Sequence, residues 1–210
     1  MSRDIDQLDW AGIAAQLDRE GHAVLPGLLG VEDAQALAGV PSTPVASDLG
    51  GDVFLLAPGL PEAVVRKFAA LHQQLARIAL RWNDILGMAQ GEDDMGLAIT
   101  LRLSRLREQD HQGLHRGAED AHAFPLQLVA LMSEPGVDFT GGEFVMVEQR
   151  PRMQSRPIVL PLKRGDVAIV PTGPRPFKGS AGHYRVTMKH AISRVRSGER
   201  IALECMYGGT

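Results

Sequence analysis

The segment YRVTMKHAISRVRSGERIALECM, residues 184–206, contributes most to the fold prediction. Apolar and polar side chains alternate along both of its halves, which is typical of β-strands with one buried face. The inward positions of the first half are Tyr184, Val186, Met188 and His190. In the second half Arg200, Ala202 and Glu204 share one face. This segment therefore predicts two strands that direct a histidine and an arginine into a protein interior.

Other short strands are predicted on both sides of this segment. Alternation begins at Leu97, and further strands are expected at residues 126–132, 143–149, 157–162 and 166–171. Turn sequences such as FTGGE and KRGD separate them. A helical part followed by many short strands indicates an α+β protein. We expect a β-barrel or jelly roll with helices packed against one sheet.

The first third of the chain shows helical periodicity. Apolar residues at Trp10, Ile13 and Leu17 predict a helix that ends at Gly21. A longer apolar stripe, from Val64 to Ile85, predicts a second helix after Pro61. The intervening residues 40–59 are rich in Pro, Gly, Ser and Asp, so we predict a loop there. The expected organisation is one domain over residues 1–210, helical to about 95 and β from about 97 to 207.

Composition narrows the classes of function. The chain has 210 residues, 44% of them hydrophobic, and a formal net charge of −3. No apolar run is long enough to span a membrane, and no global positive charge favours a nucleic-acid polymer. The single cysteine, Cys205, excludes an internal disulfide and is typical of the reducing cytoplasm. These features favour a cytoplasmic protein that acts on a small molecule.

Two residues of the segment 184–206, His190 and Arg200, are candidates for a functional site. Imidazole is the commonest protein ligand for catalytic transition metals, although a lone inward histidine such as His190 is more often a core residue. Arg200 is costly on an interior face unless it meets an anion. A second histidine, His115, follows the strand that begins at Leu97 and precedes the other predicted strands.

The order of these residues resembles the 2-oxoglutarate- and iron(II)-dependent oxygenases. The matching pieces, in chain order, are His115, FTGGEF (139–144), LKRGDVAIV (162–170), His190 and Arg200. The resemblance covers about 101–206, and GHAVLPGLLG (21–30) matches the usual opening of such proteins. It implies a double-stranded β-helix fold, with iron(II), 2-oxoglutarate and O2 as cofactor and cosubstrates. It further implies iron ligation by His115 and His190, and 2-oxoglutarate binding by Arg200. Arg105, which lies ten residues before His115 on the first predicted strand, is an additional candidate contact with 2-oxoglutarate.

One position departs from that family. The family carries His-x-Asp, but this chain has Gly117 two residues after His115. Glycine supplies no metal donor, and the same pattern is found in the radical halogenases of the superfamily, where chloride occupies the vacated position. The resemblance therefore implies that Gly117 makes room for chloride and that a substrate C–H is chlorinated. Two alternatives stay open: a hydroxylase that recruits Glu119 or Asp120, and a non-catalytic jelly-roll binding protein.

The substrate is the least constrained part of the prediction. Basic residues gather in 150–156 and 175–178, and arginine pairs well with phosphate or carboxylate. We name as candidate substrate contacts His111, Arg175, Phe177 and Lys178. By resemblance to a compact halogenase of chlorinated nucleoside antibiotic biosynthesis, an adenine deoxynucleotide is one expected substrate. A free amino acid is the other.

Overall fold

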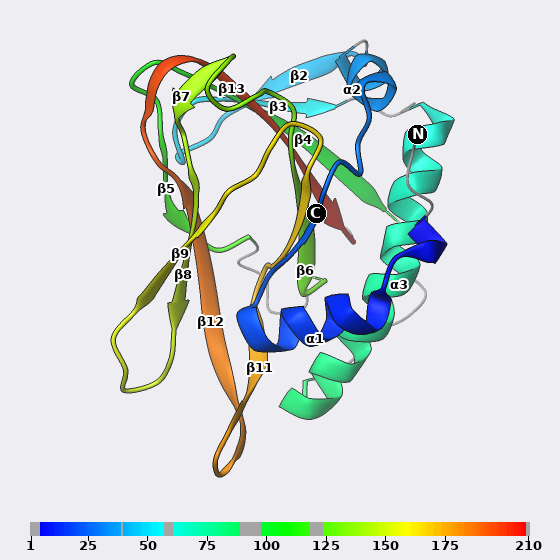
Figure 1. Ribbon diagram of the computed structural model, residues 1–210, viewed down its shortest axis with the longest axis vertical. Helices are drawn as coiled ribbons and strands as arrows, with labels where there is room; N and C mark the ends of the chain where they lie inside the picture. The colour runs from blue at the N-terminus through cyan, green and yellow to red at the C-terminus, as the bar shows by residue number, and fades with distance from the viewer. Residues whose placement is uncertain (1–4, 39, 57–60, 89–97, 118–123, 209–210) are drawn as a thin grey trace.

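Two antiparallel sheets stacked face to face form the body of the protein in this computed structural model (Figure 1). The structure describes residues 5–38, 40–56, 61–88, 98–117 and 124–208. The α+β double-stranded β-helix expected from the alternating strands is confirmed, with helices on one side of the larger sheet.

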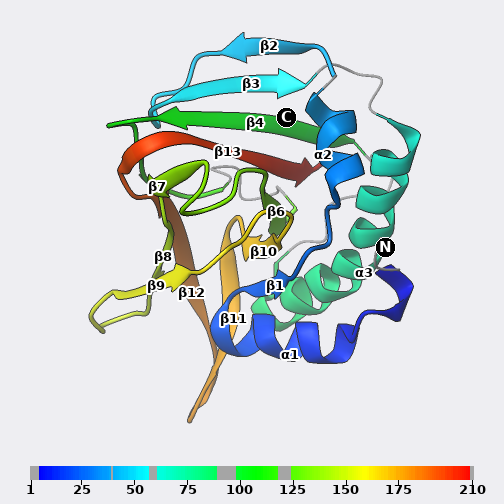
Figure 2. The same ribbon diagram turned by 45° about the horizontal axis from the view of Figure 1, so that its top comes forward.

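The larger sheet has eight strands in the order β1-β10-β6-β13-β4-β3-β2, with β7 pairing to β13. Figure 2 shows β2, β3, β4 and β13 as successive strands at one end of the molecule. The bounds are β1 Ala23–Leu25, β2 Ser42–Val45, β3 Asp52–Leu56, β4 Ile99–Arg107, β6 Leu126–Leu131, β7 Phe139–Gly141, β10 Val167–Pro171 and β13 Val195–Tyr207.

The smaller sheet has five strands in the order β11-β12-β8-β9, and β5 pairs with the other end of β12. Its bounds are β5 Gln112–His115, β8 Phe144–Gln149, β9 Arg156–Leu160, β11 Pro174–Gly179 and β12 Gly182–Ile192. The apolar residues between the sheets include Val186 and Met188 of β12 and Ala202 of β13. The predicted inward alternation of the segment 184–206 is therefore correct.

Helices cover the outer face of the larger sheet. They are η1 Ile5–Gln7, α1 Trp10–Glu20, α2 Val31–Ala38 and α3 Glu62–Leu86. α1 ends where expected, because Gly21 adopts a left-handed conformation at its C-terminus. The apolar stripe of α3 packs with Leu101, Leu203 and Cys205 from the sheet, although Ile85 at its end is exposed. The helices thus form a second core, separate from the core between the sheets.

The expected loop over residues 40–59 is partly wrong. β2 and β3 lie within it and extend the larger sheet beyond β4. All four residues of β2 are exposed, so this edge strand has no buried face to produce a periodic hydrophobic signal. β5, β7 and β11 also escaped prediction, because each is short and contains glycine or proline.

In the described part of the chain, no helix is both long and apolar enough to cross a membrane. Cys205 is buried against the helices, as expected for a small apolar residue, and burial raises the pKa of its thiol to about 12.

We predict that Leu75→Ala in α3 lowers the free energy of unfolding by about 2–5 kcal/mol, because Leu75 is fully buried and its removal leaves a cavity. Leu80→Ala on the same helix is the matched control, since Leu80 is 40% exposed and its truncation should change stability by less than about 0.5 kcal/mol. Urea unfolding of the two variants measures the difference. Equal losses would contradict the assigned packing face of α3.

Candidate metal centre

His115 and His190 lie side by side at one end of the smaller sheet. β5 pairs with β12 so that the two histidines are directly opposite, and their ring centroids are 4.2 Å apart. His190 is only 3% exposed and stacks on Phe144 of the neighbouring strand, while His115 is half-buried. The structure therefore brings together the two residues that the sequence nominated as metal ligands.

Both imidazoles can present a lone pair to a metal. Burial, together with the nearby His115, lowers the pKa of His190 to about 3, so His190 is neutral at physiological pH. The Nδ1 of His115 lies 2.8 Å from the carbonyl oxygen of Gly113. When Nδ1 donates its proton to that oxygen, the lone pair of His115 is on Nε2, an arrangement common in metal-binding histidines.

The place beside Gly117 is not open, contrary to the expectation of a chloride-sized space. A Cβ at Gly117 would lie 2.8–2.9 Å from the side-chain amide atoms of Gln127. Gln127 is 1% exposed, and its Nε2 lies 3.4 Å from Nε2 of His190. Sequence reasoning overlooked Gln127. The available signal was a single polar residue within the otherwise apolar strand LQLVAL, residues 126–131.

Arg200 lies on the inner face of β13, as predicted. It is 1% exposed, and its Nε and Nη1 have no hydrogen-bond partner among the residues that the structure describes. Burial lowers its pKa to about 10, opposed by the charge of Glu204, so the guanidinium remains a cation at neutral pH. A buried cation with unpaired donors needs an anion, and a carboxylate such as that of 2-oxoglutarate fits this requirement.

The turn in FTGGEF needs glycine at residue 142 because the side chain of Arg200 lies close to the backbone there. Gly142 has φ +63°, and a Cβ there would lie 2.9 Å from Cδ of Arg200. A larger residue would therefore both strain this backbone and push against the arginine.

Arg105 does not share the interior with Arg200, which corrects its expected contact with 2-oxoglutarate. In the β4–β13 register Arg200 pairs with Leu106 and Arg105 pairs with Ile201, so the two arginines point to opposite faces. Arg105 instead lies 3.7 Å from Glu199 on the outer face. The expected contact was based on the position of Arg105 along the sequence and did not take the strand register into account.

The inner face of the same strand pair carries Arg102 and Glu204, which are opposite one another. Burial raises the pKa of Glu204, and the positive charges of His115, Arg102 and Arg200 act against that rise. Among the described residues, however, no three His, Cys, Asp or Glu side chains are grouped closely enough to hold a metal. Glu119 and Asp120, the alternative carboxylate ligands, lie outside the described residues.

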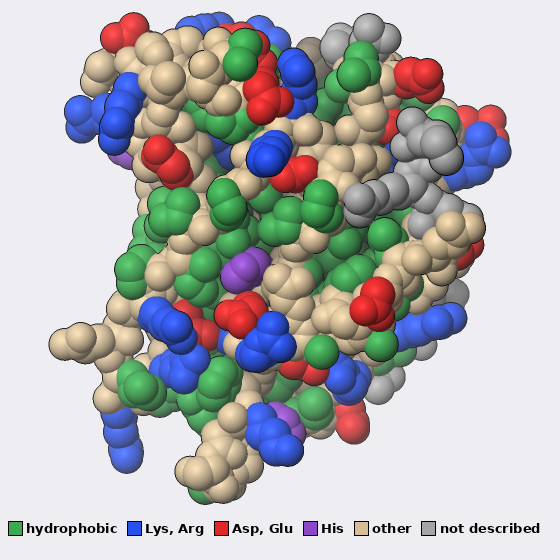
Figure 3. All heavy atoms as spheres, in the orientation of Figure 1, with side chains coloured by type: hydrophobic (Ala, Val, Ile, Leu, Met, Phe, Trp, Pro, Cys, Tyr) green, Lys and Arg blue, Asp and Glu red, His purple; other side chains and the backbone are tan. Residues whose placement is uncertain are grey.

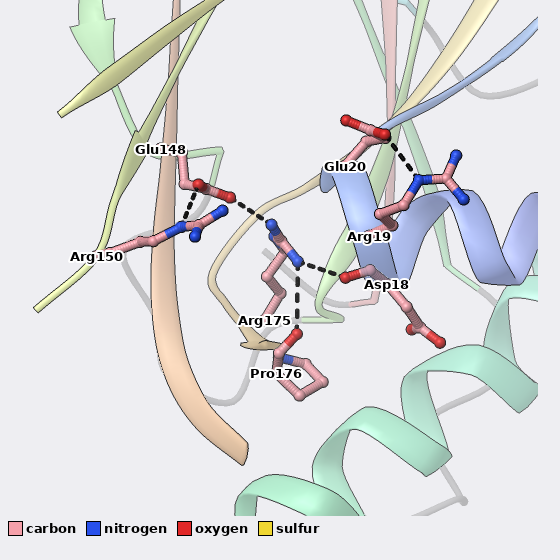
Figure 4. Close-up of polar contacts among 7 residues, drawn as sticks. All are labelled: Asp18, Arg19, Glu20, Glu148, Arg150, Arg175 and Pro176. Carbon is pink, nitrogen blue, oxygen red and sulfur yellow. Dashed lines mark hydrogen bonds and ion pairs between the residues drawn. The ribbon is translucent and has the colours of Figure 1, made fainter. Parts of the chain in front are cut away.

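Arg175 is a structural residue in this fold, not the exposed substrate contact that was expected. It is completely buried and pairs with Glu148 of β8, while its Nη1 donates to the carbonyl of Asp18, 2.8 Å away (Figure 4). Arg150 binds the other oxygen of Glu148 at 2.6 Å. A hollow of about 250 Å³ lies beside this cluster, but its lining includes neither histidine.

Phe177 and Lys178, two of the remaining candidate substrate contacts, are also apart from the histidines. The guanidinium of Arg150 covers the ring of Phe177 at 3.9 Å. Lys178 is exposed and pairs with His183, seven residues before His190 on β12, which corresponds to roughly 23 Å at about 3.4 Å per residue. His111 is exposed just before β5 begins. Phe177 and Lys178 therefore belong to a distant hairpin, which corrects their assignment.

The two stacked antiparallel sheets have the fold of solved iron(II)- and 2-oxoglutarate-dependent oxygenases. A prolyl-4-hydroxylase of Pseudomonas putida superimposes with a TM-score of 0.62 at 15% identity, covering 96% of this chain and 99% of that one. An oxygenase of the 2-oxoglutarate/iron(II) family from Burkholderia pseudomallei gives a TM-score of 0.57 at 21% identity, covering 99% of this chain and 95% of that one.

The chain belongs to the Oxygenase-NA family, whose profile matches residues 51–209 and which is described as "oxygenase, catalysing oxidative methylation of damaged DNA". An uncharacterized protein of Mycobacterium tuberculosis strain H37Rv is 41% identical over 160 residues, 70% of this chain and 69% of that protein.

We predict that Arg175→Met destabilises the fold by about 3–5 kcal/mol, because it leaves the buried Glu148 without its main partner. The double variant Arg175→Met/Glu148→Leu should recover much of that loss, since both charges are then removed. Lys178→Met, the same charge change at an exposed position, serves as control. Thermal and urea unfolding measure all three, and an unchanged stability of Arg175→Met would contradict the structural role.

Proposed function

We propose that this protein is an oxygenase that uses iron(II) and 2-oxoglutarate, with His115 and His190 as iron ligands and Arg200 as the 2-oxoglutarate anchor. One observation carries the proposal: two paired histidines and a buried arginine, two of whose nitrogen atoms have no partner among the described residues, line one interior between the sheets. Two ligating histidines suit iron(II), and the buried cation suits the far carboxylate of the cosubstrate.

The residues of the chain have separable tasks in this proposal. The bound iron would supply the activation of O2 that is coupled to oxidation of 2-oxoglutarate. Arg200 would fix the cosubstrate by charge-assisted hydrogen bonds, which also orient it. The apolar side chains between the sheets, such as Met146 and Val170, exclude water from that interior.

Hydroxylation is the outcome that we favour, because the amide of Gln127 lies close beside Gly117 and reduces the space there. Halogenation is the second candidate, and one observation supports it: residue 117 has no side chain that could supply a carboxylate to the iron. The two outcomes differ in the atom that is transferred to the substrate.

We propose a nucleotide-sized small molecule as the substrate. The family's description names damaged DNA, which makes an alkylated nucleobase the first group to test. On the face seen in Figure 3, however, Lys and Arg side chains are interspersed with Asp and Glu, and the formal net charge is −3. A polymer bound through its phosphates needs a continuous basic surface, which this face does not offer.

Turnover tests the proposed reaction. We expect the protein, loaded with iron(II) and 2-oxoglutarate, to form succinate when O2 and an alkylated deoxynucleotide are added. Mass spectrometry should show a product heavier by one oxygen, or the dealkylated nucleotide together with an aldehyde where the hydroxylated carbon is bonded to nitrogen, at saturating chloride as well. Alkylated oligonucleotides and free amino acids form the comparison arms, and His190→Ala is the inactive control. A chlorinated product would establish the halogenase instead, and absence of succinate formation under all conditions would reject the oxygenase.

The cosubstrate anchor is tested by comparing the two arginines of the β4–β13 pair. Arg200→Ala should weaken 2-oxoglutarate binding by about 10- to 150-fold, because hydrogen bonds to charged groups contribute about 1.5–3 kcal/mol. Arg105→Ala should leave the affinity unchanged, since Arg105 lies on the outer face. Titration calorimetry with the metal-loaded protein measures both. A loss caused by Arg105→Ala alone would reverse the assignment.

A further inference from the structure

Gln127 makes two contacts with the residues that surround the proposed iron position. Its amide lies where a side chain at Gly117 would begin, with Oε1 at 2.8 Å and Nε2 at 2.9 Å from a Cβ placed there. Its Nε2 is also 3.4 Å from Nε2 of His190. Gln127 is 1% exposed and occupies an inward position of β6. A polar side chain this deeply buried is retained where it has a specific partner.

We infer that Gln127 supplies the third protein donor to the metal, in place of the carboxylate that Gly117 lacks. This inference rests on the proposed function, because it takes His115 and His190 as the other two ligands. The donor would then come from β6 of the larger sheet and not from residue 117, which follows β5. It would still lie beside residue 117 in space.

The distance between Gln127 and His190 suits two ligands of one metal ion. Ligands at about 2.1 Å from a metal and at right angles to one another are about 3 Å apart. The 3.4 Å between the Gln127 amide and Nε2 of His190 is close to that separation. It is long for a hydrogen bond between nitrogen atoms, so the contact by itself satisfies neither group well.

An amide can act as this donor through its oxygen. Without a metal, the closest approach of the Gln127 amide to His190 is through its Nε2. A metal on His190 would occupy the lone pair of the imidazole, and rotation of the Gln127 amide by half a turn would then present Oε1. Amide oxygen and nitrogen are nearly the same size, so this rotation needs no further rearrangement.

A neutral amide ligand changes the charge of the centre. Two histidines and an amide leave the full charge of a divalent ion uncompensated, whereas a carboxylate would cancel one unit. The site should therefore bind anionic 2-oxoglutarate strongly, and bind the metal itself more weakly than a site with a carboxylate ligand.

Metal affinity without turnover tests this inference. Co(II) binding to the full-length protein is measured by titration calorimetry in the absence of 2-oxoglutarate. Removal of groups that only orient a ligand costs about 10- to 100-fold in affinity, so Gln127→Ala should cost about 100-fold or more. Gln127→Glu should bind Co(II) more tightly than the unchanged protein, because it offers a charged oxygen at the same place. Ser104→Ala, another buried polar residue of the same lining, is the matched control.

A double-mutant cycle with Gly117→Asp separates a ligand from a structural residue. The new side chain must displace the Gln127 amide, which can move because it is the free end of a flexible chain. Once a carboxylate occupies the place, Gln127→Ala should no longer weaken Co(II) binding. This strong non-additivity is expected only if residues 117 and 127 compete for one position on the metal. Thermal unfolding of each variant establishes that it is folded.

The outcomes distinguish this inference from the proposed function. Equal Co(II) affinity in the unchanged protein and in Gln127→Ala, with loss in His190→Ala, would overturn the role of Gln127 alone. Additive effects of the two substitutions would overturn it as well. If the unchanged protein binds neither Co(II) nor Fe(II), the proposed iron site itself is rejected.

Discussion

The pairing of β5 with β12 is the constraint on which the candidate site depends. This register sets His115 opposite His190, and both then face the larger sheet. Because side chains alternate between faces, a slip of one residue would turn His115 away from its partner. The register is maintained by β8 on the other side of β12, where His190 pairs with Met146 and Ile192 pairs with Phe144, whose side chains fill the core. Packing of the apolar core therefore fixes the geometry of the polar site.

Buried charge is distributed unequally within this interior. The charge of Arg175 is compensated by Glu148, and its Nη1 donates to a backbone carbonyl oxygen, although its Nε has no partner among the described residues. Arg200 is equally buried but keeps two donor nitrogen atoms without partners among the described residues. Because burial of an uncompensated cation is unfavourable, the difference separates a structural arginine from one that is suited to bind a ligand. Sequence alone assigned both to ligand binding.

Several elements could be predicted because each has a periodic signal of its own. In α3, β12 and β13 one face is buried, so apolar residues recur at every third or fourth position of the helix and at every second position of the strands. β2, β5 and β11 could not be predicted in this way. They are short, and β2 has no buried residue. They form because a neighbouring strand offers unpaired hydrogen-bonding groups. For β5 that neighbour, β12, is distant in sequence, whereas β2 and β11 pair with the strands that follow them.

The sequence by itself was enough to predict the fold class, to nominate His115, His190 and Arg200 as site residues, and to show that Gly117 supplies no carboxylate. Each of these inferences depends only on residue type and order along the chain. The tertiary structure decided which side chains share a face and which lie next to one another. It turned Arg105 outwards, buried Arg175 against Glu148, and put the amide of Gln127 beside Gly117. These contacts join different segments of the chain, and their positions are set by the packing of the two sheets, which no local pattern encodes.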